Sequence, residues 1–503
     1  MQDRSSKLNA LAETGPDRGQ DLFIKLVLIL LIACHVVMAS VVCVNRLSRP
    51  VLIDGMEDCI ARFAYHMSEG HDVYGPVSEQ IERLMYTPLS VHVNACAIKL
   101  FGLDIRIQRA VVLVFSLGCL LMLGLCVKKL TGSAFLGWVG AGLLLGIDVG
   151  YWYILPGPNS MHVFFSLSGL YFLIRKERLT WPDSLVATLC FFAGFWSKQT
   201  GLAYIAAGLS FLLLKDWRKG AGAVVLTMLL MAVSVGYYAA KPDSMFIFNC
   251  FQWMTYDRII WSRFLNPILF PELLGRFGIL SAIAVAGVLS IRPVFKDYLQ
   301  PQYVLLGASA FAGPFAAMKY GSGNVQSIFF YAMLIACGLA FLSQFIKEKR
   351  ISSHLAFVLL VIQAAALIHS ISVYCITDED EQRFRKVQSI LSERGKTGYY
   401  YAHGYHNVLA GKPPFANLSR DPAFERKFGR VGYPPVITQF WKRNPFDTII
   451  SFYPWEDNTP LMLEQLQQAY TLAEEIPPAV NFANSTELRR RLLVFKRKQE
   501  VQP

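Results

Sequence analysis

The sequence predicts an all-α polytopic membrane protein that ends in a small α/β domain outside the membrane. Of its 503 residues, 54% are hydrophobic and only 17% are charged, whereas a soluble domain carries roughly 25% charged residues. Apolar runs recur along residues 22–374, and the Lys and Arg residues collect in the short segments between them. After residue 374 these runs stop, and short strand-like and helix-like patterns alternate.

The apolar runs are measured against a membrane-spanning helix, which needs roughly 20 mostly apolar residues. About eleven runs are candidates by that rule. They cover residues 22–44, 109–127, 133–155, 161–174, 184–196, 201–214, 221–240, 273–291, 303–318, 326–346 and 355–374. The first run is too long for a secretory signal peptide and lacks a small-residue cleavage site, so we expect a retained helix. The two runs beside Lys198 are short, and they fit either two crossings or a broken pair.

Basic residues orient these runs. Arg4, Lys7 and Arg18 precede the first run, and Lys or Arg residues follow the second, fourth, sixth, eighth and tenth runs. Loops rich in Lys and Arg stay in the cytoplasm. The N-terminal tail, residues 1–21, is therefore predicted to be cytoplasmic, and the chain after residue 374 to be extracytoplasmic, because the number of spans is odd. The net charge of +12 follows this pattern, so we expect a lipid bilayer and no nucleic acid as a partner.

Two outer segments are long. The first outer loop covers residues 45–108 of the transmembrane domain, 22–374, and the second is the C-terminal domain, 375–503. Strand patterns lie at residues 399–402, 448–452 and 492–495. Helix patterns lie at residues 380–394 and 461–473. Their alternation predicts a small α/β domain that packs on the outer face and is not the catalytic centre.

The metal-binding residue types are scattered. The ten Cys residues include no CxxC pair, and most of them lie inside apolar runs, where Cys behaves as a small hydrophobic residue. His66, His71 and His92 do not have the spacing of metal ligands. The sequence therefore assigns no metal ligands, and a divalent metal cofactor is compatible with it but not supported.

An acidic cluster follows the first run. Asp54, Glu57 and Asp58 lie within five residues of one another. Acidic residues beside a membrane exit are often functional, and a carboxylate held there can serve as a general base. The alternative is a solvated helix start, since acids in a first turn interact favourably with the helix dipole. Composition alone favours this alternative.

Three cations are candidates for binding an anion. Lys198 lies between two apolar runs, where a cation calls for an anionic partner such as a lipid phosphate. A lysine whose side chain extends to the membrane interface is the alternative. Arg258 lies among aromatic residues that suit either a sugar or the interface belt, and Lys319 precedes a glycine-rich turn that ends at Asn324.

Several stretches resemble the GT-C glycosyltransferases. The first outer loop carries GMEDCIARFAYHMSEGHDVYGP, YTPLSVHVNACAIKLFG and RIQRAVVLVFSLG, and later segments carry FFAGFWSKQTGLAYIAAGLSFLL and KYGSGNVQSIFFYAMLIACGL. The matching positions in the first loop are Glu57, Ala64, Gly70, Tyr74, Tyr86, Pro88, Leu89, Phe101, Gly102 and Arg109. The resemblance covers most of residues 22–350 in order. Within the GT-C glycosyltransferases, the resemblance is to protein mannosyltransferases that use dolichyl-phosphate-mannose and to aminoarabinose transferases.

This resemblance implies transfer of a sugar from a polyprenyl-phosphate donor to a glycan, lipid or protein acceptor outside a bacterial inner membrane. It makes Glu57 the acceptor-activating acid, with Asp58 and Asp54 as alternates. The implied donor-phosphate residues are Lys198, Arg258 and Lys319. The implied substrate-binding residues are Tyr74, Tyr86, Asn159 and Asn324.

Two positions depart from the family pattern. Met56 precedes Glu57 where many relatives have Asp, and Asn159 stands where many relatives have the acid of an Arg-x-Asp motif. Asn159 can neither accept a proton nor carry a charge, which argues against a two-carboxylate or metal-assisted mechanism. A transporter or flippase, and an O-antigen polymerase or ligase, are the alternative functions. The absence of a detectable repeat and the concentration of unusual residues in outer loops favour the enzyme.

Overall fold

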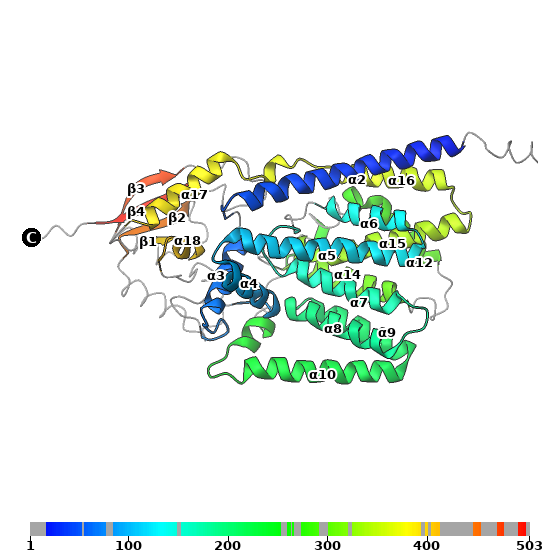
Figure 1. Cartoon of the computed structure of the whole chain (residues 1–503), viewed down its shortest axis with the longest axis horizontal. Helices are drawn as coiled ribbons and strands as arrows, with labels where there is room; N and C mark the ends of the chain where they lie inside the picture. The colour runs from blue at the N-terminus through cyan, green and yellow to red at the C-terminus, as the bar shows by residue number, and fades with distance from the viewer. Residues whose placement is uncertain are drawn as a thin grey trace, which may run out of the picture.

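The computed structural model is a bundle of helices with a small sheet at one end (Figure 1). It describes residues 17–52, 55–76, 84–147, 152–252, 259–262, 264–265, 273–290, 300–319, 324–393, 398–400, 404–412, 446–453, 470–476 and 491–498. Four described helices are long and apolar enough to cross a membrane, and the chain is therefore an integral membrane protein. They are α2 (Asp17–Ser48), α5 (Ile105–Thr131), α10 (Trp217–Ala239) and α15 (Ile328–Lys347).

Shorter helices complete the bundle. They are α6 (Ala134–Leu145), α7 (Asn159–Ile174), α8 (Trp181–Ser197), α9 (Gly201–Lys215), α12 (Gly278–Ser290), α14 (Pro301–Ala317) and α16 (Ser353–Ala366). The first outer loop forms α3 (Gly55–Ser68) and α4 (Leu89–Phe101). Short π and 3-10 turns are η2 (Phe248–Gln252), η4 (Asn324–Ser327) and η5 (Ser372–Tyr374). The number of full crossings stays a prediction.

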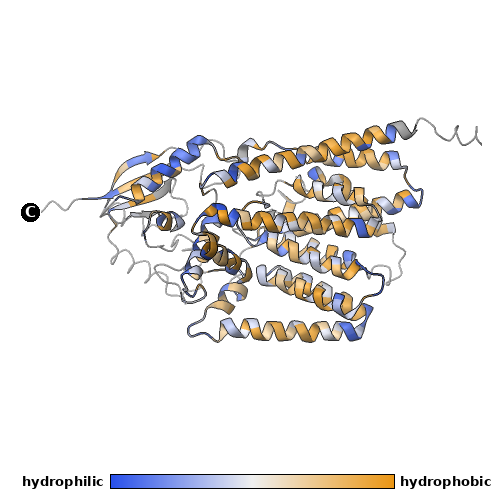
Figure 2. Ribbon diagram, viewed as in Figure 1, coloured by the Kyte–Doolittle hydropathy of each residue, from blue (hydrophilic) through white to orange (hydrophobic). Residues whose placement is uncertain are grey.

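Helix α15 forms the centre of the bundle. Of its most apolar window, 89% is buried, compared with 17–33% for α2, α5 and α10. The long helices other than α15 therefore keep broad apolar surfaces on the outside of the bundle (Figure 2). Such surfaces are expected to face lipid, because lipid chains solvate apolar side chains as a protein core does.

Local sequence signals set the ends of these helices. At the start of α5 the side chain of Asp104 accepts a hydrogen bond from the backbone N–H of Arg106. At its end Gly132 adopts a left-handed conformation, with φ 77°, that closes the helix. The predicted run 133–155 is wrong in its second half, because α6 ends at Leu145 and residues 152–158 form turns. These turns contain Pro156 and Pro158, and α7 begins at the next residue, Asn159.

A four-stranded sheet follows the bundle. Its strands are β1 (Gly398–Tyr400), β2 (Thr448–Tyr453), β3 (Tyr470–Ile476) and β4 (Arg491–Arg497), in the order β1-β2-β4-β3. Only β1 and β2 pair in parallel. Two helices accompany the strands, α17 (Asp378–Leu391) and α18 (Gly404–Leu409). The sheet lies at the same end of the bundle as α3 and α4 (Figure 1).

One secondary-structure prediction in this region is wrong. A helix was expected over residues 461–473, but residues 470–473 begin the edge strand β3, while 461–469 lie outside the described residues. A register shift between Leu472 and Glu474 interrupts the strand's alternation. Only Tyr470 and Ile476 of this strand are buried, so its sequence lacks the period of two that indicates a strand.

Candidate functional site

The lysine predicted to bind phosphate, Lys198, lies in a break between two helices. Helix α8 ends at Ser197 and α9 begins at Gly201. The side chain of Lys198 is only 4% exposed, and its Nζ donates a hydrogen bond to Oδ1 of Asn159, the first residue of α7. The structure thus joins two residues that the sequence placed in one site.

The charge of Lys198 is not balanced by a carboxylate within the part of the chain that the structure describes. Its partner is the amide oxygen of Asn159, which accepts a hydrogen bond without supplying a negative charge. A buried ammonium group is costly unless an anion offsets its charge. With an amide rather than a carboxylate beside Lys198, the described residues leave a site suited to an anionic ligand.

Three helices begin beside this lysine, and rings from their first turns are in contact. The ring centroids of His162 in α7 and Tyr204 in α9 are 5.2 Å apart, and that of Phe329 in α15 lies 4.3 Å from Tyr204 and 6.3 Å from His162. No side-chain capping bond is made at the N-caps of these helices, which are Pro158, Thr200 and Ser327. Each helix start carries a partial positive charge, so the three add to the attraction of Lys198 for an anion.

The first outer loop is fastened to the same break. Thr87 donates a hydrogen bond from Oγ1 to the carbonyl oxygen of Phe195, near the end of α8, at 2.9 Å. Nε2 of Gln199 donates to the carbonyl oxygens of Met85 and Cys250, the latter at 3.1 Å. Gln199 therefore ties the outer loop and η2 to the segment that carries Lys198.

The two tyrosines predicted to bind substrate support this loop. Tyr74 is fully buried, and its hydroxyl donates to the carbonyl oxygen of Tyr86 at 2.7 Å. Its ring packs edge-on against Tyr238 and Phe246, with centroid distances of 5.2 and 5.0 Å. Burial raises the pKa of the Tyr74 hydroxyl well above its ordinary value. The described contacts shape the loop, and contact of either tyrosine with substrate stays a prediction.

Glu57, the predicted base, is held in a buried ion pair. Its two carboxylate oxygens accept hydrogen bonds from Nε and Nη2 of Arg109 at 2.9 and 2.8 Å, and both side chains have no exposed surface. Arg109 also donates to the carbonyl oxygens of Arg46 at 2.6 Å, Arg49 at 2.9 Å and Val51 at 2.6 Å. All five guanidinium N–H groups are thus used. A role for Glu57 as base requires an acceptor to displace Arg109 from one carboxylate oxygen.

The two alternate acids differ in what the structure shows. Asp58 follows Glu57 in the first turn of α3 and is 1% exposed. Its Oδ1 accepts the backbone N–H of Tyr405 at 2.8 Å, and its Oδ2 lies 3.7 Å from Nη2 of Arg62. Asp54 lies outside the described residues.

The remaining predicted residues lie at the edge of what is described. Lys319 pairs with Ile259 in an isolated β-bridge, and its Nζ lies 5.8 Å from the ring centroid of Phe315. Asn324 is the first residue of η4, but its side chain and all of Arg258 lie outside the description. Within the described residues, no group of three His, Cys, Asp or Glu side chains is arranged to hold a metal ion.

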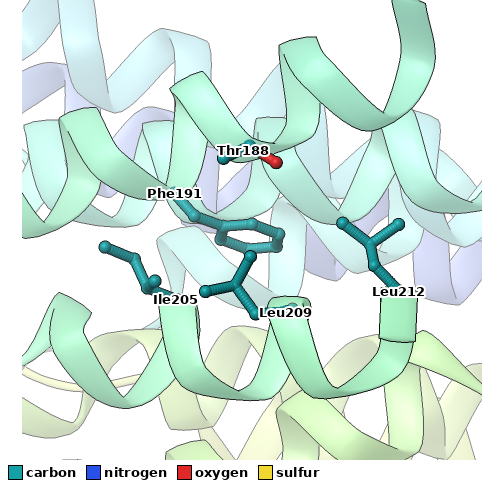
Figure 3. Close-up of a pocket in the computed structure, with 6 residues that line it drawn as sticks. Thr188, Phe191, Ile205, Leu209 and Leu212 are labelled. Atoms are coloured by element: carbon teal, nitrogen blue, oxygen red, sulfur yellow. The ribbon is translucent and has the colours of Figure 1, made fainter. Parts of the chain in front are cut away.

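An apolar recess lies between α8 and α9 (Figure 3). Phe191 and Ile205, which line it, are each seven residues from Lys198, or about 10 Å along a helix. The ring of Phe191 leaves no room for a side chain at Gly208, where an added Cβ would lie 2.7 Å from it. This recess is lined almost entirely by carbon, so it cannot bind a charged group, and Lys198 marks the candidate site.

Arg109, His162 and Tyr204 carried no predicted role. Arg109 was named only as a matching position of the resemblance, the arginine that begins the second apolar run, although an acid that opens a loop and an arginine that closes it could have suggested a pair. His162 and Tyr204 lie on apolar helix faces, where nothing in the sequence distinguishes them from core residues. Their meeting depends on how three helix starts converge.

The helical membrane body, the short helices of its first outer loop and the sheet at the same end define a polytopic membrane protein of the GT-C fold. Solved structures share this fold. ArnT from Cupriavidus metallidurans bound to undecaprenyl phosphate matches with a TM-score of 0.57 and 14% identity, over 93% of this chain and 97% of ArnT. Its apo structure matches equally well.

A second neighbour is more distant. The Archaeoglobus fulgidus oligosaccharyltransferase, in complex with Zn and sulfate, matches with a TM-score of 0.50 and 10% identity, over 89% of this chain and 72% of that one. No protein-family model matches the sequence, and no curated protein is significantly similar to it. The comparisons therefore establish the fold, which is the one that the sequence resemblance implied.

Proposed function

We propose that the chain is a membrane glycosyltransferase that moves a sugar from a polyprenyl-phosphate donor to an acceptor at the outer face of the membrane. The observation that carries this proposal is the buried charge of Lys198, which no carboxylate of the described residues balances, at the point where α7, α9 and α15 begin. The shared fold of ArnT, a protein captured with undecaprenyl phosphate, supports the choice of a prenyl phosphate as the anion.

The reaction would be a substitution at the anomeric carbon of the donor sugar. The acceptor oxygen forms a bond to that carbon, the bond from carbon to phosphate oxygen breaks, and the phosphate leaves with the electron pair. A carboxylate of the first outer loop takes the acceptor proton, with Glu57 as first candidate and Asp58 and Asp54 as alternates. Lys198 and the helix starts stabilise the negative charge that develops on the leaving phosphate.

The rest of the assignment follows the predicted topology. We place the N-terminal tail, 1–21, in the cytoplasm and the domain at 375–503 in the periplasm of a bacterial inner membrane. Residues 22–374 form the transmembrane domain. Arg258 and Lys319 are proposed as further phosphate contacts, and Asn159 and Asn324 as further substrate contacts.

Binding of undecaprenyl phosphate to the full chain in lipid nanodiscs tests this proposal. Lys198→Met keeps the length of the side chain and removes its charge, and it should weaken binding at least about tenfold, since a hydrogen bond to a charged group contributes about 1.5–3 kcal/mol. Lys215→Met is the matched control, because Lys215 is an exposed lysine at the other end of α9. Equal binding by Lys198→Met and the native chain would refute the site.

Transfer of the sugar needs a test of its own, apart from binding of the lipid phosphate. Lipids extracted from a strain without the protein should contain an accumulated prenyl-phosphate sugar, and restoring the native chain should remove it. If the purified chain binds the lipid phosphate but no strain difference in sugar-modified lipid or envelope glycan is found, the transporter alternative is favoured over the enzyme.

A further inference from the structure

The acids of helix α3 bind two different parts of the molecule. Glu57 and Asp58 are neighbours in sequence, so their side chains leave the helix about 100° apart. Glu57 pairs with Arg109 of the membrane helix α5, whereas Asp58 accepts the backbone N–H of Tyr405 in α18, which belongs to the C-terminal domain. Helix α3 is therefore held between the membrane bundle and the outer domain.

An apolar contact surrounds the bond between Asp58 and Tyr405. Five buried residues from the first outer loop, the start of α5 and α18 pack together there, namely Leu52, Ala61, Ile105, Tyr405 and Val408. Asp58 itself is 1% exposed. A carboxylate that accepts an N–H bond in such a dry interface is expected to hold it strongly, because hydrogen bonds to charged groups are stronger than neutral ones and water does not compete for them.

Helix α18 is connected to the rest of the outer domain. Nε2 of Gln388 in α17 donates to the carbonyl oxygen of His406 in α18 at 3.3 Å. In turn, α17 packs Val387 and Leu391 against the sheet residues Ile450 and Val494. A displacement of the sheet would thus be passed through α17 and α18 to α3.

The start of the domain is fixed to the end of α2. The side-chain amide of Asn45 both donates to the carbonyl oxygen of Ile376, at 3.0 Å, and accepts its N–H, at 2.6 Å. Arg49 forms an ion pair with Asp378 at 2.7 Å. Among the described residues, the outer domain is therefore attached at these two places, and of the two the attachment through Asp58 involves the helix that carries the candidate base.

We propose that Asp58 is a positioning residue and that the outer domain, through α18, sets the placement of α3. This inference rests on the proposed function for its effect on transfer, but the attachment itself does not. Undocking of α18 frees the face of α3 that carries Asp58, about 100° around the helix from the face that contacts Arg109, and the acceptor-activating carboxylate then loses its fixed position. The domain acts on the reaction without contacting the sugar.

Two substitutions at one position separate positioning from proton transfer. Asp58→Asn retains Oδ1 as an acceptor for the Tyr405 N–H, whereas Asp58→Ala removes it. In the full chain in nanodiscs, hydrogen exchange of the amides at 404–409 should rise about tenfold or more in Asp58→Ala and change little in Asp58→Asn. Transfer should follow the same order, with a rise in KM for Asp58→Ala and a smaller rise for Asp58→Asn.

Other outcomes overturn the proposal. Unchanged exchange at 404–409 in Asp58→Ala would show that the bond does not hold α18. Equal loss of transfer in both variants, with native exchange in Asp58→Asn, would make Asp58 a proton acceptor instead. If Asp58→Ala does not fold, Val408→Ser is the second variant, because it weakens the same contact from α18 and leaves Glu57 and Asp58 intact. The proposal then requires faster hydrogen exchange of the α3 amides in Val408→Ser. Exchange needs no donor lipid, so a native chain without transfer activity would refute the proposed function and leave this test valid.

Discussion

Arg109 and Glu57 form a bidentate ion pair in which neither side chain has any exposed surface. Arg109 donates its three remaining N–H groups to the backbone carbonyls of Arg46, in the last turn of α2, and of Arg49 and Val51, which follow that helix. One arginine therefore fixes the first membrane helix, the loop helix α3 and its own helix α5 relative to one another.

Loss of this arginine should destabilise the chain. Arg109→Met leaves the carboxylate of Glu57 buried without its partner, which typically costs about 3–5 kcal/mol of unfolding free energy. Arg106→Met on the same helix is the control, because Arg106 pairs with Asp104 at the surface, where an ion pair contributes about 0–1 kcal/mol. Denaturation in detergent, followed by tryptophan fluorescence, measures the difference. Similar stabilities of the two variants would contradict the described pair.

Substitution of Glu57 tests its proposed role as the base. Glu57→Gln retains an oxygen that can accept from Arg109 but cannot take a proton, so transfer should fall about 100- to 10,000-fold at equal amounts of folded protein. The assay is transfer from the purified prenyl-phosphate sugar. Near-native transfer by Glu57→Gln would assign the base role to another acid of the cluster and restrict Glu57 to pairing with Arg109.

A carboxylate at position 159, where many GT-C glycosyltransferases carry an acid, should weaken binding of the prenyl-phosphate donor. Asn159→Asp places a carboxylate against Lys198, where it neutralises the ammonium group and repels a phosphate. We expect affinity for undecaprenyl phosphate to fall on the order of 10- to 100-fold. Asn159→Ala removes the hydrogen bond but adds no charge, so it should weaken binding less. Tighter binding by Asn159→Asp would indicate that Lys198 does not meet the phosphate.

Removing the side-chain amide of Gln199 should loosen the outer loop. Gln199→Leu has a similar size but leaves the carbonyls of Met85 and Cys250 without this donor. Hydrogen exchange at residues 84–88 and 248–252 should therefore increase together, and the KM for donor should rise more than kcat falls. Thr87→Ser is the control, since it keeps the hydroxyl that binds Phe195. An increase in only one of the two segments would contradict a shared attachment.

The predicted orientation of the chain can be measured with single cysteines. Lys412 follows α18 in the outer domain, and Lys215 ends α9 at the opposite end of the bundle. In intact cells or spheroplasts, a membrane-impermeant thiol reagent should label Lys412→Cys, whereas Lys215→Cys should react only after lysis. The background is a variant without the exposed native cysteines Cys34 and Cys96. Labelling of Lys412→Cys only from the cytoplasm would reverse the topology.

The sequence predicts the membrane helices more completely than it predicts the contacts of the candidate site. Apolar length and charge anticipated the long helices, because crossing a bilayer constrains composition over whole segments. The run predicted over 133–155 was too long, because α6 ends at Leu145, and strand β3 was missed, since a bulge interrupts its alternation. The family resemblance assigned Lys198 to the donor phosphate and Asn159 to the substrate, but it did not predict the hydrogen bond between them. The engagement of Glu57 by Arg109 and of Asp58 by Tyr405 depends on tertiary packing that no spacing encodes.

The shortness of α8 and α9 has a consequence for the surrounding bilayer. With 17 and 15 residues, these helices are about 26 and 23 Å long, whereas the hydrocarbon layer is about 30 Å thick. Such hydrophobic mismatch is relieved when the lipids next to the two helices thin the layer locally. Thinning beside α8 and α9 would lower the outer headgroup plane toward Lys198. A lipid diffusing in the outer leaflet would then bring its phosphate closer to the buried lysine along the α8–α9 edge.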